Sequence, residues 1–390
     1  MNSSAKGFMN AVLHALPISD RVKARWKIYR LVDRILFSEK DVKKAEKDVE
    51  YKKRLIEQQK RKYPGKYMEI ESCALKLAGD NQELVFDMIF SYFAYGYTPN
   101  EFLCYGFQHK SLVERRTFLS DRDSVRYAYR WNPWDDMDLF MDKAKTYQRF
   151  QKYYGRTLFV FDKNTNYKAF KEFISQKQKI VKKNPRESCG RSVELLEIGN
   201  EEKLHHELYN GLKAELKKVN SLVLEEVVSQ HLDMAKYNAS SVNTIRCITL
   251  KTKSGEIIVP FCFMKVGRNG SFVDNGGAGG LLVGIDEKTG QLNSDAIDEA
   301  GKRYKFHPDT GAQFMGEWLP EWEKMISICK EMASELETIK WVGWDMAYTD
   351  KGWIVIEGNG ATEIIGPQST SGKGVRKKME QLMVDTISII

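Results

Sequence analysis

The sequence predicts a mixed α/β protein of the α+β type, in which an N-terminal helical subdomain precedes two lobes that each combine helices with a sheet. Three observations lead to this fold class. The chain has 390 residues, too many for one ordinary hydrophobic core. Residues 1–62 repeat apolar side chains at helical spacing, and a mixed helical pattern continues to residue 135. From residue 157 onward, short apolar runs alternate with charged helical segments.

The composition is that of a soluble globular protein, with 42% hydrophobic and 29% charged residues. No apolar run approaches the length of a membrane span, and the run at residues 11–16 is too short for a secretory signal. The six cysteines lack the paired spacing of zinc sites. We therefore expect a cytoplasmic protein with reduced thiols.

The formal charge of +8 is concentrated at the N-terminus, where residues 1–62 contain 17 basic and 8 acidic side chains. A basic amphipathic helix around Trp26 and Tyr29 is of the kind that lies on an anionic membrane, which would bring the protein to the inner face of the membrane. The alternative is that its apolar stripe packs on the protein. A basic nucleic-acid-binding protein is a weaker hypothesis, because no recognition motif accompanies the charge, and we expect no nucleic-acid partner.

The helical region is divided into basic N-terminal helices, residues 1–65, and a helical or α+β subdomain, residues 66–140. One helix is predicted over residues 39–62, ending before Pro64. Residues 66–135 are rich in aromatic side chains and arginines, and indicate only a helical subdomain.

A small lobe is predicted over residues 141–228. Asp142 and Lys143 begin a helix that runs to Tyr154 and ends at Gly155. The predicted strands are residues 157–161, 179–182, 192–198 and 222–228, and the predicted helices are 167–175 and 201–219.

A larger lobe is predicted over residues 229–390. Its strands are residues 243–250, 257–264 and 281–285, with a glycine-rich loop at 274–280. Helices are predicted at 315–338 and 375–387.

Between these two helices, residues 341–362 predict a β-hairpin with a three-residue loop that ends at Gly352. If Thr349 pairs with Trp353, then Asp345 lies opposite Glu357. Because side chains alternate along a strand, Glu357 and Asn359 share a face, and two carboxylates and an amide oxygen converge.

Like charges directly opposed destabilise a hairpin, so this arrangement favours a bound cation. A hard cation with oxygen ligands, above all Mg2+, is the natural candidate. The alternative is an ordinary surface hairpin with its acids in solvent.

Other candidates are charged residues in or beside apolar strands. Lys182 ends a predicted strand before a loop containing Ser188 and Gly190, which is flexible enough to close over phosphates. The chain contains neither a G-x-x-x-x-G-K-[ST] string nor a G-x-G-x-x-G string between strand and helix. The alternative for Lys182 is simple exposure.

Glu225 and Glu226 lie in the apolar run that ends at Val228, whose backbone groups could face an adenine edge. The alternative is an edge strand with both acids in solvent. Arg246 lies in the middle of an apolar strand and needs an anion, either a phosphate or a carboxylate in a structural ion pair.

Three residues between the second strand of the large lobe and the glycine-rich loop could hold an anionic substrate, with solvated turn residues as the alternative. They are Lys265, Arg268 and Asn275.

Taken in order, these motifs resemble those of the ATP-grasp ligases, over residues 142–359. Asp142-Lys143 resembles the D-K pair whose lysine reaches the nucleotide, and I-V-K at 180–182 with the Gly190 loop resembles the second phosphate lysine and its flap. L-E-E-V at 224–227 resembles the hinge that holds adenine, with Val228 and Gln230 following it. N-T-I-R at 243–246 resembles the strand whose arginine faces the transferred phosphate. Asp345, Glu357 and Asn359 match the metal ligands.

The resemblance implies an ATP-grasp fold, with two α+β lobes clasping ATP, and Mg2+ as the metal, with Mn2+ as an alternative. Two positions depart from the usual pattern. K-K-N-P at 182–185 stands where K-P is common, so either Lys182 or Lys183 is the phosphate lysine. Gln230-His231 stands where a ribose-binding glutamate is usual.

More narrowly, S-V-N-T-I-R-x-x-T, D-N-G-G-A-G-G and V-G-W-D resemble the branch associated with sugar transfer and surface-polysaccharide clusters. This implies a carboxylate–amine ligase that acts through an acyl phosphate on small-molecule carboxylate and amine substrates. The amine could belong to an amino sugar, a sugar nucleotide or a lipid-linked glycan. The alternative is an ATP-grasp phosphotransferase acting on a sugar or hydroxyl.

Overall fold

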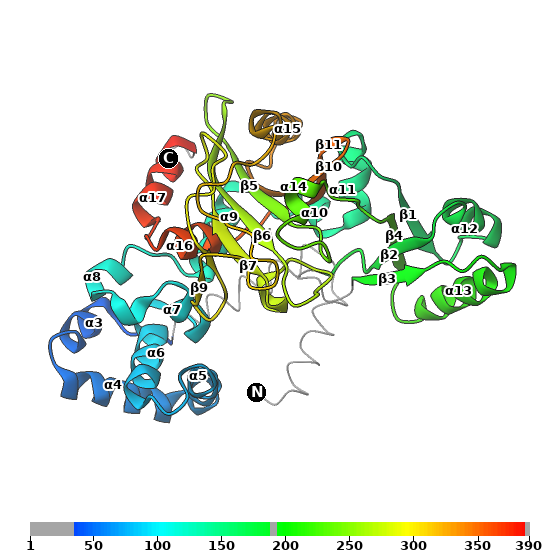
Figure 1. Ribbon diagram of the computed structural model, residues 1–390. Helices are drawn as coiled ribbons and strands as arrows, with labels where there is room; N and C mark the ends of the chain where they lie inside the picture. The colour runs from blue at the N-terminus through cyan, green and yellow to red at the C-terminus, as the bar shows by residue number, and fades with distance from the viewer. Residues whose placement is uncertain (1–34, 188–192, 387–390) are drawn as a thin grey trace.

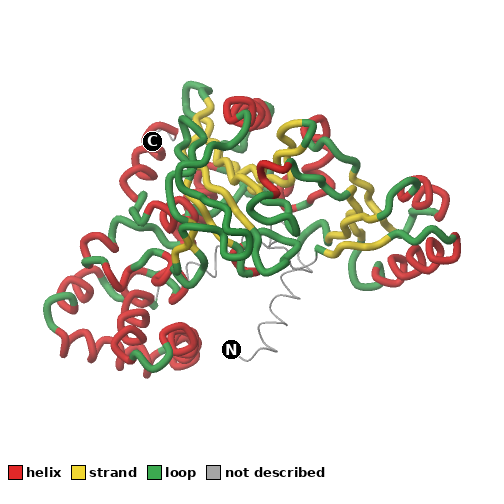
Figure 2. The backbone as a smooth tube through the Cα atoms, in the orientation of Figure 1, coloured by secondary structure: helices red, strands yellow, loops and turns green. Residues whose placement is uncertain are grey.

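The computed structural model describes residues 35–187 and 193–386. Within these residues, a layer of helices and a small antiparallel sheet lie at opposite ends of the molecule, with a large antiparallel sheet between them (Figures 1 and 2). The basic stretch around Trp26, for which the sequence predicts an amphipathic helix, lies outside the described residues.

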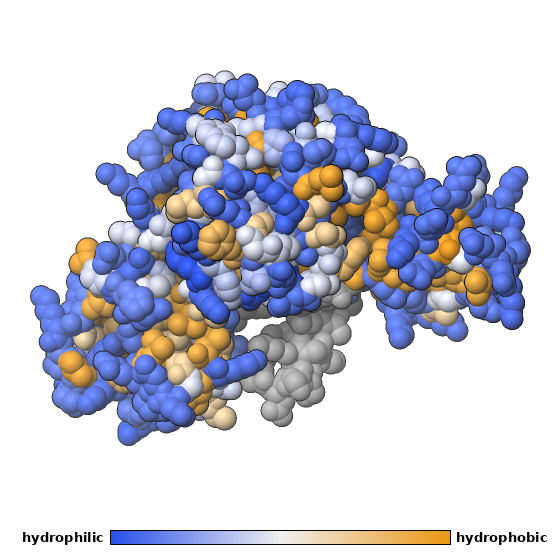
Figure 3. All heavy atoms as spheres, in the orientation of Figure 1, coloured by the Kyte–Doolittle hydropathy of each residue, from blue (hydrophilic) through white to orange (hydrophobic). Residues whose placement is uncertain are grey.

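The N-terminal helices enclose an aromatic core that includes Phe90, Phe93, Phe102 and Phe107. The helix expected over residues 39–62 is two helices, because Asp48 accepts a hydrogen bond from the Tyr51 amide and begins a new helix. Figure 3 shows apolar residues on the surface of this helical layer, and Met68 of α5 is 65% exposed. The helices are α3 (Glu39–Ala45), α4 (Val49–Lys62), α5 (Pro64–Ala78), α6 (Gln82–Tyr95), α7 (Pro99–Cys104) and α8 (Leu112–Arg115).

The small sheet has the strand order β1-β4-β2-β3 and is antiparallel throughout. Side chains alternate, so Ile180, Leu222 and Leu224 point to a core shared with two helices, whereas Val181 and Glu225 point to the opposite face. The elements are β1 (Leu158–Asp162), β2 (Lys179–Lys183), β3 (Glu194–Glu197), β4 (Ser221–Glu226), α12 (Tyr167–Ile174) and α13 (Glu202–Glu215).

The large sheet has the strand order β11-β10-β5-β6-β7-β8-β9, again antiparallel. Ile245 and Cys247 of β5 point to the face covered by α15, and Ile248 and Leu250 point to the face covered by α9 and α17. The strands are β5 (Thr244–Lys251), β6 (Ile257–Val266), β7 (Leu281–Gly284), β8 (Ala296–Ile297), β9 (Arg303–Tyr304), β10 (Trp341–Thr349) and β11 (Gly352–Asn359). The helices around it are α9 (Asp121–Trp131), α15 (Trp322–Ser334), α16 (Ile365–Ser371) and α17 (Arg376–Thr386).

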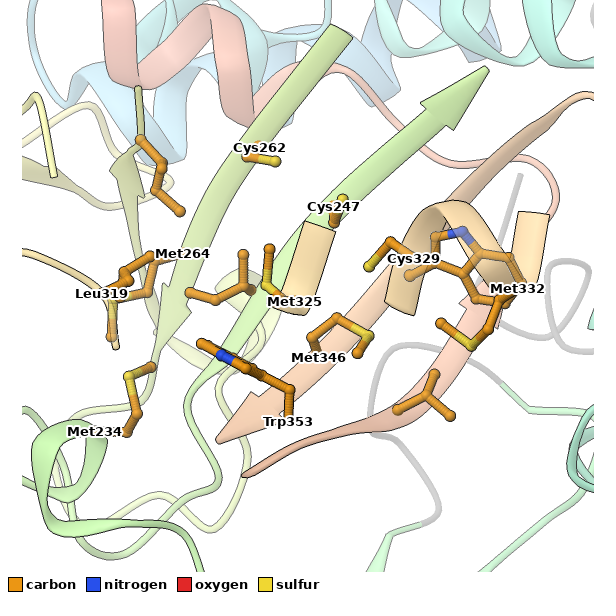
Figure 4. Close-up of a cluster of buried hydrophobic side chains, with 14 of the residues drawn as sticks. Met234, Cys247, Cys262, Met264, Leu319, Met325, Cys329, Met332, Met346 and Trp353 are labelled. Atoms are coloured by element: carbon orange, nitrogen blue, oxygen red, sulfur yellow. The ribbon is translucent and has the colours of Figure 1, made fainter. Parts of the chain in front are cut away.

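The core beneath α15 is rich in sulfur. Cys247, Cys262 and Cys329 lie together beside Met325 and Met346, as Figure 4 shows. These cysteines are free thiols and are buried among apolar side chains. Polarisable sulfur fills irregular space between a twisted sheet and a helix.

None of the helices in the described ranges has the length and hydropathy needed to span a membrane. The helix expected over residues 315–338 begins only at Trp322, because residues 315–321 form a loop in which Trp318 bridges to Gln291. The strand expected to reach Val228 ends at Glu226.

The register of the hairpin differs from the expected one at its turn. Thr349 pairs with Gly352, not with Trp353, so the loop contains two residues. A β-bulge between Met346 and Asp345 then shifts the register back by one residue, and Asp345 lies opposite Glu357 as expected. The residue left over on β11 is Ile356.

Candidate active site

A cleft of about 350 Å³ opens between the two sheets. Both lobes contribute to its lining, and four basic side chains meet four acidic ones there. The basic residues are Lys143, Arg156, Lys183 and Lys265, and the acidic ones are Glu187, Asp274, Asp345 and Glu357.

Lys143 lies in the first turn of α11 (Lys143–Phe150), where Asp142 caps the helix by accepting a hydrogen bond from the Ala144 amide. Its Nζ donates to the backbone oxygen of Glu187. Among the described residues, Lys143 forms no salt bridge with a carboxylate, and burial lowers its pKa. A half-buried ammonium with no carboxylate partner in the described ranges is ready to receive an anionic ligand.

The two adjacent lysines of β2 point to opposite faces of the small sheet. Lys182 lies on the face that carries the helices, and its Nζ contacts Glu194 and Glu215, each at 2.7 Å. Lys183 lies on the cleft face, and its Nζ lies 3.0 Å from Glu225 Oε2. The geometry therefore favours Lys183 over Lys182 as the lysine of this strand that faces a ligand.

Glu225 is 3% exposed and is held by two cations. Its Oε2 accepts from Lys183 at 3.0 Å and from Arg156 at 2.9 and 3.0 Å. Burial alone would raise the pKa of Glu225, but Lys183 and Arg156 outweigh burial and lower it to about 2. Glu226 points to the other face, where it contacts Lys177 and accepts from the Thr157 amide.

Asp345 is 1% exposed and forms the centre of a second charged group. Its carboxylate accepts from Arg246 at 2.5 and 3.0 Å and from Lys265 Nζ at 3.0 Å. Burial would raise the pKa of Asp345, but Arg246 and Lys265 outweigh burial and hold it well below its usual range. The charge of Asp345 is thus compensated by two cations, whereas the sequence had favoured a metal ion for this role.

Glu357 lines the cleft and is half-buried. Asn359 Nδ2 donates to Glu357 Oε1 at 3.4 Å, so these two side chains share a face, as the alternation predicts. Within the two described ranges, Glu357 forms no salt bridge with a lysine or arginine, and no group of three or more His, Cys, Asp and Glu side chains is arranged as a metal site. Oxygen donors from Asp345, Glu357 and Asn359 fit a hard cation that takes its remaining ligands from phosphate and water.

The glycine-rich loop lies beside Lys265. Asp274 accepts from the amide and hydroxyl of Thr244 at 3.0 and 2.5 Å, and Asn275 lines the cleft. Arg268 does not line the cleft: it donates to Gly279 O at 2.5 Å and to Tyr304 Oη at 2.8 Å. These bonds hold the loop in place. The Arg268 guanidinium therefore binds protein groups and does not face the cleft, where the sequence had suggested that it could hold an anionic substrate.

The apolar part of the cleft follows the end of β4. Val227 and Val228 line it together with Val181 and Ile356, which form a slot suited to a planar base. Gln230 also lines the cleft, but its amide is used by the 238–243 loop: it donates to Asn238 O and Ser241 O and accepts from the Asn243 amide. Gln230 therefore shapes the cleft wall and has little capacity left for a ribose.

Ser188 and Gly190, expected in a flap over phosphates, lie outside the described residues. Three charged residues of the cleft, Arg156, Glu187 and Asp274, were not among the candidates identified from the sequence. Arg156 follows a helix in an unremarkable G-R-T string, and Asp274 belongs to the glycine-rich loop but was not singled out.

Structures similar to this chain include several ligases of low sequence identity. They are VanG D-Ala:D-Ser ligase from Enterococcus faecalis (16% identity, TM-score 0.40, covering 63% of this chain and 62% of that chain), D-alanyl-alanine synthetase A from Vibrio cholerae (14%, 0.38, 63% and 66%), and an ADP complex of N5-carboxyaminoimidazole ribonucleotide synthetase (16%, 0.35, 59% and 47%). The chain covers less than two thirds of the length of each of these proteins. No curated protein sequence matches it.

A protein family described as sugar-transfer associated ATP-grasp matches residues 122–383, which is more than half of the chain. The matched stretch contains both sheets and all of the cleft residues. It confirms the family resemblance of the sequence motifs and the ATP-grasp fold that they imply. This chain belongs to the sugar-transfer-associated ATP-grasp family.

Proposed function

We propose that this protein is an ATP- and Mg2+-dependent carboxylate–amine ligase that acts through an acyl phosphate. The observation that carries the proposal is the meeting of three buried or half-buried lysines with an acid pair in one cleft. Lys143, Lys183 and Lys265 supply positive charge, and Asp345 and Glu357 supply oxygen ligands on the opposite strands. This is the charge pattern that a nucleoside triphosphate with a divalent cation requires.

The apolar slot supports a nucleotide in one orientation. The valines after β4 line one part of the cleft, and the lysines line another. A planar base in the slot would place its phosphates toward Lys143 and Lys183. Lys143 gains most from this ligand, because it is the cleft lysine for which no carboxylate partner is found in the described ranges.

Glu357 and Asn359 would hold Mg2+ together with Asp345. When bound, Mg2+ would neutralise the charge of the phosphates during transfer. Asp345 would share its carboxylate with Arg246 and Lys265, so Glu357 is the ligand whose charge is least compensated by the protein.

In the proposed reaction, a substrate carboxylate oxygen attacks the γ-phosphorus of ATP, and the bond to the ADP oxygen breaks. The products of this step are ADP and an acyl phosphate. An amine then attacks the acyl carbon and loses a proton, and inorganic phosphate leaves. The protein contributes position and charge neutralisation, which its lysines and Arg246 supply.

The family description supports a role in sugar transfer, and we propose that the amine belongs to an amino sugar, a sugar nucleotide or a lipid-linked glycan of a surface polysaccharide. The carboxylate would be an amino acid or a similar small acid. The reaction would take place in the cytoplasm, where ATP is available. The basic stretch around Trp26, which lies outside the described residues, would bring the enzyme to the inner face of the membrane.

The test is trapping of the acyl phosphate. Purified full-length protein is incubated with ATP, Mg2+, hydroxylamine and pools of amino acids or other small carboxylates, and hydroxamates are detected by mass spectrometry. A ligase gives a hydroxamate with equal amounts of ADP, and free phosphate appears only when a carboxylate is present. A stable phosphorylated sugar without any hydroxamate would instead identify a phosphotransferase. The Glu357→Gln variant serves as the inactive control.

A further inference from the structure

Arg156 lies in the short connection between the 3-10 helix η2 (Gln151–Tyr153) and β1. Its side chain is 4% exposed, as is that of its partner Glu225. Arg156 is far from both β11 and Lys183 in sequence, yet its guanidinium contacts β11 directly and reaches Lys183 through the shared partner Glu225. This position makes Arg156 a side chain that joins the two lobes at the cleft.

All five N–H groups of the guanidinium have acceptors. Nε and Nη2 donate to Glu225 Oε2 at 3.0 and 2.9 Å. Nη1 donates to Tyr154 O at 3.2 Å and to Val355 O at 2.8 Å, and Nη2 donates to Ile356 O at 3.2 Å. A planar fork with five donors is found only in arginine, and a lysine could not make these bonds together.

Two of these acceptors are successive carbonyls on one strand. In a regular strand, successive carbonyls point to opposite sides, so a single side chain cannot ordinarily reach both. Ile356 is the extra residue of the β-bulge, and the bulge turns its carbonyl to the side of Val355 O. Arg156 thus binds the backbone at the point where the bulge restores the pairing of Asp345 with Glu357.

We propose that Arg156 is a positioning residue that holds the β11 bulge and, through Glu225, ties it to Lys183. The bulge places Glu357 and Asn359, and Glu225 holds Lys183 at 3.0 Å. Arg156 would therefore fix the distance between the metal ligands of the large lobe and the phosphate lysine of the small lobe. The role of Arg156 in binding Mg2+ with ATP rests on the proposed function. Its hold on the β11 bulge rests only on the contacts given above.

A buried backbone carbonyl that loses its donor is costly, so removing the fork should allow the bulge to rearrange. The first measurement is hydrogen exchange by mass spectrometry on ligand-free protein. In Arg156→Gln, exchange of the β11 amides should accelerate by about 10-fold or more, while peptides from α15 remain unchanged.

The second measurement is the affinity for a non-hydrolysable ATP analogue, with Mg2+ and with EDTA, by calorimetry. The Mg2+ effect is the ratio of the analogue's Kd in EDTA to its Kd with Mg2+. In Arg156→Gln this ratio should fall by about 10- to 100-fold, the range found when residues that orient metal ligands are removed. Affinity in EDTA should change by no more than about threefold, because Lys143 and the three valines of the apolar slot remain.

The matched control is Arg149→Gln. Arg149 also joins two elements through a backbone carbonyl, donating to Glu335 O at 2.6 Å, but it does not line the cleft. This variant should leave both β11 exchange and the Mg2+ effect at wild-type values. Should Arg156→Gln fail to fold, Arg156→Lys takes its place, since it keeps the charge and aliphatic stem and loses the fork.

Unchanged β11 exchange and an unchanged Mg2+ effect in the Arg156 variant would overturn the proposal. So would equal losses of affinity with and without Mg2+, accompanied by faster exchange throughout the chain, because Arg156 would then stabilise the fold alone. If the wild-type protein binds no adenine nucleotide, the proposed function fails, and the exchange measurement still decides whether Arg156 holds the bulge.

Discussion

Asp345 and Arg246 face each other on adjacent strands and form a two-pronged ion pair, with Nε 2.5 Å from Oδ1 and Nη2 3.0 Å from Oδ2. The sequence left open whether Arg246 binds a phosphate or forms a structural ion pair. The structure shows Arg246 paired with Asp345, and Lys265 shares the same carboxylate. Asp345 therefore has a structural role, because it compensates the charge of Arg246 and Lys265 independently of any metal that it could bind.

The first prediction concerns the stability of Asp345→Asn. The substitution keeps the shape of the side chain but leaves Arg246 and Lys265 buried without their carboxylate. Breaking a buried ion pair from one side typically costs about 3–5 kcal/mol, so the free energy of unfolding should fall by that amount. Chemical denaturation at pH 7 measures it. Asp350→Asn, in the exposed turn of the same hairpin, is the control and should change stability by less than about 0.5 kcal/mol. Equal stability of the two variants would show that the ion pair contributes nothing.

The second prediction concerns Glu357→Gln, which should separate activity from stability. Glu357 is half-buried and, in the described part of the chain, forms no salt bridge with a lysine or arginine. Its substitution therefore leaves no buried cation without a partner. The melting temperature should stay within about 2 °C of the wild-type value, whereas ATP-dependent turnover should fall by about 100-fold or more if Glu357 is a metal ligand, as we propose. Scanning calorimetry and an ADP-release assay check the two quantities on one sample. Retained turnover would remove Glu357 from the metal site.

The hairpin shows how a correct pairing can follow from two compensating errors. The sequence indicated a three-residue loop, and alternation alone then gave the pairing of Asp345 with Glu357. The structure has a two-residue loop and a bulge at Ile356, which cancel. No local sequence pattern indicates this bulge, because the guanidinium that binds its carbonyl belongs to Arg156, about 200 residues away.

Other differences arise from long-range contacts in the same way. The periodicity of β2 could not decide between Lys182 and Lys183 until Glu215 and Glu225 were known to lie on opposite faces. Arg268 and Gln230 are polar residues near the cleft, yet their hydrogen bonds are used by the loops around them. By contrast, the longer strands of both sheets were predictable, because their apolar pattern is a local property, whereas the two-residue strands β8 and β9 were missed.

The third prediction compares the two lysines of β2. Lys183→Gln should weaken binding of a non-hydrolysable ATP analogue by about 10-fold or more, the loss expected for one charge-assisted bond to phosphate. Lys182→Gln should leave the affinity within about twofold, because Lys182 contacts Glu194 and Glu215 on the far face of the sheet. Calorimetric titration of both variants measures the difference. A larger loss in Lys182→Gln would mean that the strand presents its other face to the nucleotide.

The last prediction concerns the pH dependence of nucleotide binding through Lys143. Burial lowers the pKa of Lys143 in the free protein, and bound phosphates would raise it by favouring the charged form. Binding therefore takes up a proton at pH values between these two pKa values, and affinity should fall as pH rises through the pKa of the free state. In the wild type, the binding enthalpy at alkaline pH should depend on the ionisation enthalpy of the buffer. In Lys143→Met this dependence should decrease by the contribution of one group, while at neutral pH the variant binds more weakly. If wild type and Lys143→Met show the same proton uptake, Lys143 does not contact the phosphates.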